Sequence, residues 1–362
     1  MDLLLKLENY YAHTSFFQEQ LADLLSRIEN QLIVIYGAGT GGCRLYDLIV
    51  ENTSPDKILC FVDDDITNDK KRQCKKEILT FENALMKYDV NATYIIASFA
   101  FSLINPKLIK NGIKNIIYYP ELIIDTTTIN DLHLIKEKII DTYSLLNDET
   151  SKLLFENLLK ARLTGQINLL NETYDPVEYF GKQNITLNEE EVYVDAGAFN
   201  GDTIIKFTNA VDNKYNKIIA FEINEKNFEE LTRNTKKFKN LVLINKGLFS
   251  ENTTLRFDGS RGRCGIDESG DNEIEVVMLD NFFDITPTLI KMDIEGAEMA
   301  ALMGAKKIIK ELKPKLAICV YHKPEDLWDI PLYIKSLVPE YRFTLRNHAY
   351  KSTLEIVLYA QL

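Results

Sequence analysis

Two glycine-rich segments constrain the fold of this chain most, because each follows a short apolar run and precedes a helical pattern. The first is Gly37–Gly42 after the run Leu32–Tyr36, and the second is Gly197–Gly201 after Val192–Asp195. A strand that leads through a glycine turn into a helix is the first step of a parallel α/β unit. We therefore expect two such units within the 362 residues.

Strands alternate with helical patterns around the first glycine turn, as they do in a small parallel sheet. We expect amphipathic helices in residues 1–30 and a Rossmann-like nucleotide-binding domain over residues 31–120. The expected strands are Leu32–Tyr36, Ile58–Val62, Tyr94–Ala97 and Asn115–Tyr118. The expected helices are Arg44–Glu51, Phe81–Lys87 and Pro106–Asn111.

Residues 121–188 show helical patterns without strand alternation, and we interpret them as a helical connector. Residues 189–362 show a second α/β pattern of five strands with crossover helices, followed by a terminal hairpin whose short turn requires antiparallel neighbours. The predicted fold class is therefore α/β, with two Rossmann-like units joined by helices. The expected strands are Val192–Asp195, Ile218–Ile223, Leu241–Asn245, Leu289–Asp293, Leu316–Tyr321, Tyr341–Arg346 and Leu354–Tyr359. The expected helices lie near Gly201–Thr208, Glu225–Lys237, Met299–Lys310 and Asp326–Val338.

Composition and charge exclude several classes of protein. With 46% hydrophobic and 27% charged residues, the chain is typical of globular proteins rather than of disordered, collagenous or coiled-coil ones. A net charge of −12 repels a phosphate backbone, so nucleic acid is not an expected partner. No apolar run approaches the roughly 20 residues that a membrane span needs, and no secretory signal is evident.

The cysteines indicate a reducing compartment. The five residues Cys43, Cys60, Cys74, Cys264 and Cys319 are scattered and form no C-x-x-C pair. An odd number without close pairs argues against a disulfide framework and against structural zinc. We expect a cytoplasmic protein and a homodimer, with the helical connector as a candidate for the contacts between subunits.

The first glycine turn matches G-x-G-x-x-G through Gly37, Gly39 and Gly42. Such a turn lets the backbone approach a phosphate at the start of a helix. Asp63 and Asp64 end the next expected strand, where a partner for ribose hydroxyls belongs. The alternative is that these glycines only permit the turn and the packing.

The second glycine turn has a different spacing, in which Asp195 ends the strand and Gly197 and Gly201 follow. A carboxylate beside bare backbone suits a cationic cofactor that carries no pyrophosphate, and S-adenosylmethionine is such a molecule. Glu222 lies 27 residues after Asp195 and can accept hydrogen bonds from both ribose hydroxyls.

Three carboxylates follow the fourth expected strand of the second unit. Asp293 ends this strand, and Glu295 and Glu298 lie at the turn into the next helix. Asp293 and Glu295 are candidate catalytic residues, and their oxygens can hold a divalent metal such as Mg²⁺ that orients and acidifies a hydroxyl. We interpret Glu298 as a complement to the positive end of the helix.

Histidines and arginines supply the remaining candidates. His322 ends the fifth strand, on the edge that carries Asp293, and suits a general base. The alternative for His322 is a structural histidine at a strand end. His348, in the terminal hairpin turn, and Arg261 and Arg263, in a glycine-rich loop, are candidate substrate-binding residues. Solvated loop charges are the alternative for the arginines.

Over residues 191–362 the sequence resembles the FkbM family of S-adenosylmethionine-dependent methyltransferases. The motifs that carry the resemblance are the Asp195–Thr203 turn, Phe221-Glu222, Val277-Met278-Leu279-Asp280 and Leu289-Ile290-Lys291-Met292-Asp293-Ile294-Glu295-Gly296-Ala297-Glu298. Ala198-Phe199-Asn200 stands where the family usually has smaller residues. The resemblance implies a class I methyltransferase sheet and O-methylation, commonly of a sugar hydroxyl. The cofactor-binding residues that it implies are Asp195, Gly197, Asn200, Gly201, Asp202, Thr203, Glu222 and Asp293.

Residues 31–120 resemble the small nucleotide-binding domain at the front of sugar acyltransferases and polysaccharide-biosynthesis proteins. The shared features are the Gly-x-Gly turn and the strand end Phe61-Val62-Asp63-Asp64-Asp65. The resemblance implies a nucleotide or nucleotide sugar as ligand. The residues that would bind it are Gly37, Gly39, Gly42, Asp63 and Asp64.

The predicted function is S-adenosylmethionine-dependent transfer of a methyl group to a hydroxyl of a sugar, glycan or nucleotide sugar. The acceptor is then a small molecule or a glycan. One alternative is an NAD-dependent oxidoreductase that uses the first glycine turn. Another alternative is a non-catalytic nucleotide-sugar-binding protein with two degenerate units.

Overall fold

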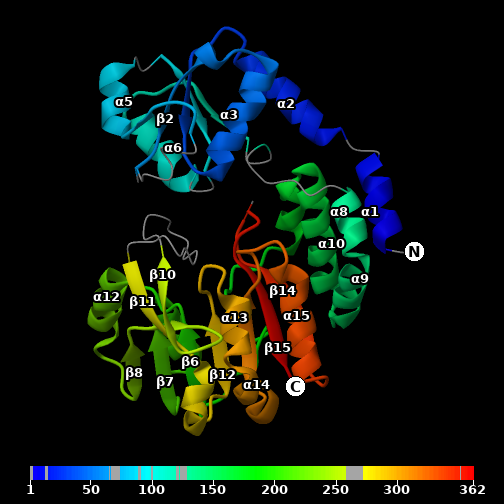
Figure 1. Cartoon of the computed structure of the whole chain (residues 1–362), viewed down its shortest axis with the longest axis vertical. Helices are drawn as coiled ribbons and strands as arrows, with labels where there is room; N and C mark the ends of the chain where they lie inside the picture. The colour runs from blue at the N-terminus through cyan, green and yellow to red at the C-terminus, as the bar shows by residue number, and fades with distance from the viewer. Residues whose placement is uncertain are drawn as a thin grey trace. The chain divides into compact units, whose positions relative to one another are not determined.

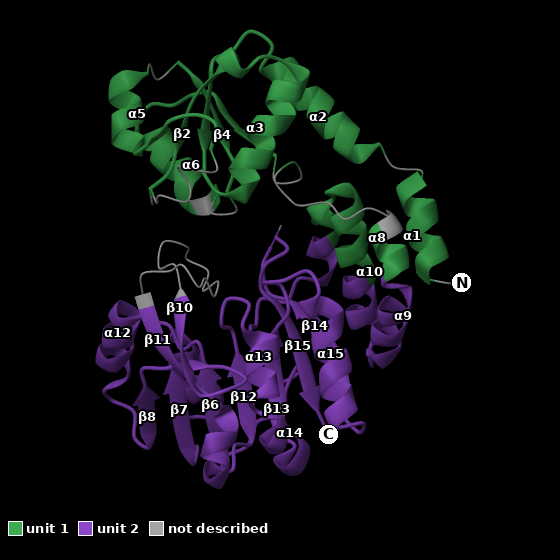
Figure 2. Ribbon diagram, viewed as in Figure 1, with its two compact units in different colours: residues 1–134, 156–169 green, residues 135–155, 170–362 purple. Residues whose placement is uncertain are grey.

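The computed structural model describes residues 3–12, 15–64, 66, 74–88, 91–98, 101–119, 122, 129–257, 272–350 and 352–362. It divides into two compact units, shown in Figure 2. The first unit comprises Met1–Leu134 and Glu156–Leu169, and the second comprises Ile135–Phe155 and Leu170–Leu362. No helix in the part of the chain described has the length and apolar character that crossing a membrane requires.

The first unit contains a five-stranded sheet in the order β3-β2-β1-β4-β5, in which every pairing is parallel. Four of its strands were expected, and the additional one is the two-residue strand β3. Apolar side chains pack on both faces of this sheet, because alternate residues of β1 join two different core clusters. The strands are β1 (Ile33–Tyr36), β2 (Ile58–Val62), β3 (Ile78–Leu79), β4 (Thr93–Ile96) and β5 (Ile116–Tyr118).

Helices surround this sheet and continue into the segment that follows it (Figure 1). The helix after the first glycine turn is α3, which Gly39 caps. One of the boundaries between the two units, at residues 155/156, falls inside α10. The helices up to residue 173 are α1 (Leu3–Ala12), α2 (Phe16–Arg27), α3 (Thr40–Asn52), η1 (Pro55–Lys57), α5 (Phe81–Lys87), α6 (Phe101–Lys110), α8 (Ile129–Leu134), α9 (Lys136–Leu145), α10 (Glu149–Thr164) and η2 (Ile167–Thr173).

The second unit contains a seven-stranded sheet in the order β14-β15-β13-β12-β6-β7-β8. Five consecutive strands of this sheet run parallel to one another, namely β13, β12, β6, β7 and β8. The strand β15 pairs antiparallel with both β13 and β14. The predicted α/β class and the terminal antiparallel hairpin are therefore confirmed. The strands are β6 (Val192–Ala196), β7 (Lys217–Phe221), β8 (Leu241–Ile244), β12 (Leu289–Met292), β13 (Lys315–Cys319), β14 (Arg342–Asn347) and β15 (Ile356–Gln361).

A separate three-stranded sheet, in the order β10-β11-β9, was not expected from the sequence. Its strands are β9 (Gly247–Leu248), β10 (Thr253–Phe257) and β11 (Asn272–Val277). Arg261, Arg263 and Cys264 belong to the connection between β10 and β11 and lie outside the described residues.

The predicted single helix Met299–Lys310 is wrong, because the structure has two helices there. Gly304 separates them, and a Cβ atom at Gly304 would lie 1.9 Å from the carbonyl oxygen of Phe249. The Asp280 carboxylate accepts hydrogen bonds from the backbone N–H groups of Lys307 and Ile308 and so caps the second helix. The helices of this unit are α11 (Asp202–Ala210), α12 (Glu225–Thr235), η3 (Leu279–Ile285), α13 (Glu298–Met303), α14 (Lys306–Leu312) and α15 (Asp326–Leu337).

Candidate active site

A pocket of about 730 Å³ lies at the carboxyl edge of the seven-stranded sheet. Residues that follow β6, β7, β12 and β13 line it, together with residues of the small sheet and of the terminal hairpin. In open α/β sheets, ligands bind outside the carboxyl ends of the strands. The pocket is therefore the candidate active site of the second unit.

The turn after β6 passes very close to the end of β12. Gly197 has a φ of 77°, and a Cβ atom there would lie 1.8 Å from the carbonyl oxygen of Asp293. The N–H groups of Gly197 and Ala198 both donate to the carbonyl oxygen of Phe221, each at 3.0 Å. Glycine is thus required at position 197 both by the backbone conformation and by the close approach of the two strand ends.

Glu222 follows β7 and reaches the same pocket. Its carboxylate accepts hydrogen bonds from the backbone N–H groups of Phe199, at 2.9 Å, and Asn224, at 2.8 Å. Burial raises the pKa of Glu222, although these two donors oppose the effect. The two N–H groups fix the orientation of the carboxylate at the wall of the pocket.

Beneath the turn, Asp195 and Lys291 form a fully buried ion pair. Lys291 Nζ lies 3.2 Å from Asp195 Oδ1 and donates a hydrogen bond to the carbonyl oxygen of Gly197 at 2.8 Å. Burial disfavours the ammonium ion, but the charges of Asp195 and Asp293 outweigh burial and raise the pKa of Lys291. Lys291 also contributes to the lining of the pocket, so it places a buried positive charge below the turn.

Asp293 faces the pocket, and two tyrosines hold its carboxylate. Tyr179 Oη donates a hydrogen bond to Oδ2 at 3.2 Å, and Tyr321 Oη donates to Oδ1 at 3.4 Å. Tyr321 Oη also lies 3.5 Å from Glu355 Oε1. Burial and the charge of Asp293 raise the pKa of Glu355 to about 7. Hydroxyl and carboxyl groups therefore surround Asp293 on the pocket side.

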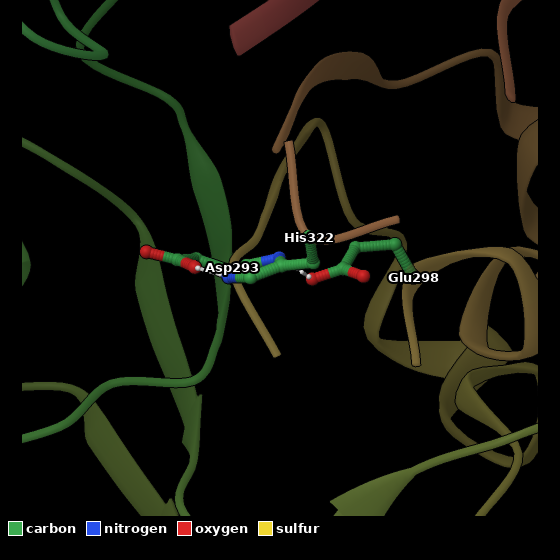
Figure 3. A group of neighbouring side chains, drawn as sticks. All are labelled: Asp293, Glu298 and His322. Carbon is green, nitrogen blue, oxygen red and sulfur yellow. Dashed lines mark ion pairs between the residues drawn. The ribbon is translucent and has the colours of Figure 1, made fainter. Parts of the chain in front are cut away.

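His322 lies behind Asp293, between that carboxylate and Glu298, as Figure 3 shows. Its Nδ1 atom is 2.8 Å from Glu298 Oε1, and its Nε2 atom is 3.4 Å from Asp293 Oδ1. Burial disfavours the imidazolium, but Glu298 and the charges of Asp293 and Glu295 outweigh it and raise the pKa of His322. Both ring nitrogens are inaccessible to solvent, so Asp293 rather than His322 is the group that meets the pocket.

Most of the second unit matches a known protein family. Residues 195–352 match the family described as the methyltransferase FkbM domain. Residues 195–352 are an FkbM methyltransferase domain. The domain includes every residue discussed above as lining the pocket except Tyr179 and Glu355.

The whole chain shares its fold with a solved structure, described as a methyltransferase FkbM from Methylobacillus flagellatus KT. That structure is 22% identical, with a TM-score of 0.67, and the match covers 99% of this chain and 98% of the other. Fibrillarin from Aeropyrum pernix, with natively bound S-adenosyl-L-methionine, is 10% identical over 49% of this chain and 70% of its own, with a TM-score of 0.32. An rRNA methylase from Streptococcus thermophilus is 17% identical over 54% of this chain and 93% of its own, with a TM-score of 0.32. No curated protein matches the sequence significantly.

The other residues of the methyltransferase domain that were predicted to bind the cofactor differ in whether they line the pocket. Asp202 and Thr203, at the start of α11, line the pocket. Asn200 and Gly201 do not line it; Asn200 Oδ1 accepts the N–H of Asp202, and Gly201 is the N-cap residue of α11. Asp195 is also absent from the lining, since its carboxylate is buried beside Lys291.

His348 lines the pocket, but protein groups occupy both of its ring nitrogens. Nδ1 lies 2.8 Å from the carbonyl oxygen of Asp175, and Nε2 lies 2.9 Å from Tyr359 Oη. Burial lowers the pKa of His348. The neutral ring therefore presents an edge rather than an unused nitrogen to the pocket of the methyltransferase domain.

One group of side chains within the described residues has metal-ligating geometry. Asp293, Glu298 and His322 each offer a ligand atom, and these atoms lie within 4.8 Å of one another. Glu295, which the sequence suggested as the partner of Asp293, is not a member of this group, although its Oε2 atom lies 3.6 Å from His322 Nε2. One imidazole with two carboxylates suits Zn²⁺, Mn²⁺ or Fe²⁺ better than Mg²⁺.

The candidate nucleotide-binding residues of the first unit meet at the carboxyl edge of its sheet. Asp63 Oδ2 accepts a hydrogen bond from the N–H of Ala38 at 2.8 Å. Asp64 accepts from Tyr36 Oη at 2.9 Å and from Lys107 Nζ at 2.8 Å. The glycines differ: a Cβ atom would clash with backbone at Gly37 and Gly42, whereas no heavy atom lies within 4 Å of one at Gly39.

Sequence reasoning missed four residues around Asp293, namely Tyr179, Lys291, Tyr321 and Glu355. Lys291 had a usable signal, because a charged residue in the middle of a fully buried strand needs a buried partner. Tyr321 directly precedes His322 and shares the strand end. Tyr179 and Glu355 come from irregular segments distant in sequence, and no spacing connects them with Asp293.

Proposed function

We propose that the chain is an S-adenosylmethionine-dependent O-methyltransferase whose acceptor is a hydroxyl of a sugar, glycan or nucleotide sugar. The observation that carries this proposal is the position of Asp293. Its carboxylate meets the pocket of the methyltransferase domain, at the same sheet edge as Glu222 and Gly197. Hydroxyl and imidazole groups hold it from the other sides.

The pocket residues suit the cofactor in shape and in charge. Glu222 offers a fixed carboxylate to ribose hydroxyls, and the bare backbone of Gly197 lines the same pocket. Six acidic and three lysine side chains line the pocket, an excess of negative charge that favours a cation. S-adenosylmethionine supplies an electrophilic methyl group on a positively charged sulfur.

Asp293 is the group that we assign to accept the proton of the acceptor. An alcohol is a poor nucleophile at neutral pH, and a base within hydrogen-bond reach removes its proton as the new bond to carbon forms. The proton passes from the hydroxyl oxygen to Asp293 Oδ1 as that oxygen takes the methyl group, and His322 Nε2, 3.4 Å from Oδ1, orients the carboxylate. Glu298 holds His322 from the other side and is a positioning residue.

A polyhydroxylated acceptor suits the groups next to Asp293. Tyr321 Oη and the Glu355 carboxyl group lie 3.5 Å apart beside Asp293, and Glu178 also lines the pocket. Carboxylates and phenols pair well with neighbouring hydroxyls of a sugar. A neutral sugar hydroxyl therefore matches this part of the pocket better than a phosphate or carboxylate does.

Metal-assisted methyl transfer is the second candidate mechanism, because Asp293, Glu298 and His322 can hold a metal ion. A metal there would replace the short contact between His322 Nδ1 and Glu298 Oε1. Removal of metal ions by a chelator distinguishes proton transfer to Asp293 from metal-assisted methyl transfer. Turnover that survives dialysis against EDTA supports proton transfer to Asp293, and turnover that is lost with EDTA and restored by Mn²⁺ or Zn²⁺ supports the metal.

For the first unit we propose a nucleotide or nucleotide sugar as ligand. Support comes from the glycine turn at the start of α3 and from Asp63 at the end of β2. An NAD-dependent oxidoreductase predicts tight NADH binding with turnover of the nicotinamide. A non-catalytic binding protein predicts sugar-nucleotide binding without any methyl transfer.

The test of the proposal measures transfer of labelled methyl from S-adenosylmethionine to a panel of sugars, glycans and nucleotide sugars. For the accepted sugar, Asp293→Asn should lower kcat about 10²-fold or more, a larger effect than the one on cofactor affinity, to which Asp293 is also expected to contribute. Asp329→Asn, on the surface of α15, is the matched control and should keep wild-type kcat. Absence of transfer to every acceptor, or wild-type kcat in the Asp293→Asn variant, would contradict the proposal.

A further inference from the structure

Two cysteines of the first unit meet beside the glycine-rich turn. Cys43 lies in the first turns of α3, and Cys74 lies 31 positions later in the sequence. Their sulfur atoms are 3.4 Å apart, and both side chains are half-buried. Cys74 Sγ also lies 3.5 Å from the carbonyl oxygen of Ala38, within the glycine turn itself, so its single S–H donates either to that oxygen or to Cys43.

We propose that Cys43 and Cys74 form a reversible disulfide that ties residue 74 to the glycine-rich turn of the first unit. The sulfur atoms need to approach by about 1.4 Å to reach the bonded distance of about 2.05 Å. Cys60 and Cys319 provide the contrast, because both are fully buried in their cores. This inference does not depend on the proposed methyl transfer.

The surroundings of Cys43 favour the reactive form of its thiol. The hydrogen bond with Cys74 lowers the pKa of Cys43 to about 7, although burial and the charge of Asp47 oppose this effect. Lys75 adds a positive charge nearby, and the positive end of a helix also favours a thiolate. Cys43 is therefore the attacking sulfur, and Cys74 is the resolving one.

The reaction that forms the bond is thiol–disulfide exchange with a small disulfide such as glutathione disulfide. The Cys43 thiolate attacks one sulfur of glutathione disulfide and releases one glutathione thiolate. The Cys74 thiolate then attacks Cys43 Sγ in the mixed disulfide and releases the second. The two cysteines lose two electrons, glutathione disulfide gains them, and the two thiol protons end on the two glutathione molecules.

Oxidation would change the turn that is expected to bind a ligand. The Cys74 thiol loses its proton, so its sulfur can no longer donate a hydrogen bond to the Ala38 carbonyl oxygen. The N–H of the same residue, Ala38, donates to Asp63, one of the candidate ligand-binding side chains. The disulfide would therefore lie next to Ala38, the residue that joins the glycine turn to Asp63.

The experiment uses the full-length protein, equilibrated in buffers of rising glutathione disulfide to glutathione ratio and then alkylated. We expect Cys43 and Cys74 to lose alkylation together, the chain to lose the mass of two hydrogen atoms, and peptide mapping to recover one Cys43–Cys74 linked pair. Dithiothreitol should restore both thiols. Cys60 and Cys319 serve as internal controls that remain unchanged at every ratio.

Single variants separate a specific pair from general oxidation. In Cys43→Ser and in Cys74→Ser, the remaining thiol should form only a mixed disulfide with glutathione. In Cys74→Ala, which leaves no donor at position 74, alkylation of Cys43 should also require a higher pH than in the wild type, because the lowering hydrogen bond is gone. The proposal is overturned if Cys43 and Cys74 stay alkylable under oxidising conditions, or if Cys43 instead links to Cys264.

Discussion

Lys291 is the side chain whose charge needs most explanation, because it is 1% exposed inside a strand that is buried throughout. Its partner Asp195 is equally buried, and the ammonium group also binds the carbonyl oxygen of Gly197. A buried pair of this kind is costly to break, since the remaining charge has no water to solvate it. The pair therefore holds the turn after β6 in place.

Substituting one partner of this pair tests its role. Lys291→Met should lower the free energy of unfolding by about 3–5 kcal/mol, because Asp195 is left charged and unpaired. The double variant Asp195→Asn with Lys291→Met should recover part of the loss. Urea denaturation measures both, with the solvent-exposed Lys214→Met as a control that changes stability by less than about 0.5 kcal/mol. A Lys291→Met variant within about 1 kcal/mol of the wild type would contradict the argument.

Because the carboxyl group of Asp326 is buried, we expect the stability of the protein to depend on pH. It is 2% exposed, and burial together with the charge of Glu298 raises its pKa to about 7. The unfolded chain releases this proton near pH 4, whereas the folded protein keeps it until about pH 7. Stability is therefore lost as the pH rises from about 4 to about 7, and it changes no further above that range.

Asp326→Asn removes this titration. The variant should match the wild type most closely near pH 4 and should gain stability over it as the pH rises, by at most roughly 4 kcal/mol at pH 8. Urea midpoints at pH 4.5 and pH 8 measure the change. Asp329→Asn, on the same helix and paired with Lys138 at the surface, should show no gain that grows with pH. If the stability of Asp326→Asn and Asp329→Asn changes with pH in the same way, the buried carboxyl group of Asp326 is not the group that titrates.

At the scale of elements, the strands that position the site were predictable because their apolar runs are continuous and end at glycine or acidic residues. The expected strand Leu289–Asp293, for example, corresponds to β12. The small sheet was missed although Glu273, Ile274, Glu275 and Val276 alternate in polarity. β11 has six residues, more than the four of β12, but its pairing with β9 and β10 depends on contacts that only the folded chain brings together.

The helix break at Gly304 could not be read from local periodicity for a similar reason. The helical pattern continues through residues 299–310, and the interruption comes from the Phe249 carbonyl oxygen and the Asp280 carboxylate. Both groups are distant in sequence from the helix. Tertiary contacts therefore override the local pattern there.

The junction of β6 and β12 gives a prediction about elements. Gly197→Ala should cost at least about 2 kcal/mol and weaken cofactor binding, because its Cβ would collide with the Asp293 carbonyl oxygen at a positive φ. Gly39→Ala is the matched control, since it has open space and a φ of −84°. It should cost less than about 1 kcal/mol. Thermal unfolding and cofactor titration measure both variants, and equal effects would contradict the close approach.

For the whole molecule, the fold shared with the Methylobacillus flagellatus protein extends over both units. The site was predictable where it depends on the sheet edge, which brings Gly197, Glu222 and Asp293 to one pocket. It was not predictable where the depth of a side chain matters. His322 lies behind Asp293, and Asp195 lies beneath the turn, because their neighbours Glu298 and Lys291 are buried with them.

The most direct measurement for the account as a whole is calorimetric titration of the full-length protein with S-adenosylmethionine. We predict one saturable site per chain. Glu222→Ala should weaken binding about 10- to 100-fold, because hydrogen bonds to a charged group are worth about 1.5–3 kcal/mol, while Glu225→Ala, at the exposed start of α12, should bind as the wild type does. Absence of binding at millimolar cofactor, or equal affinity in the Glu222→Ala variant, would contradict the account.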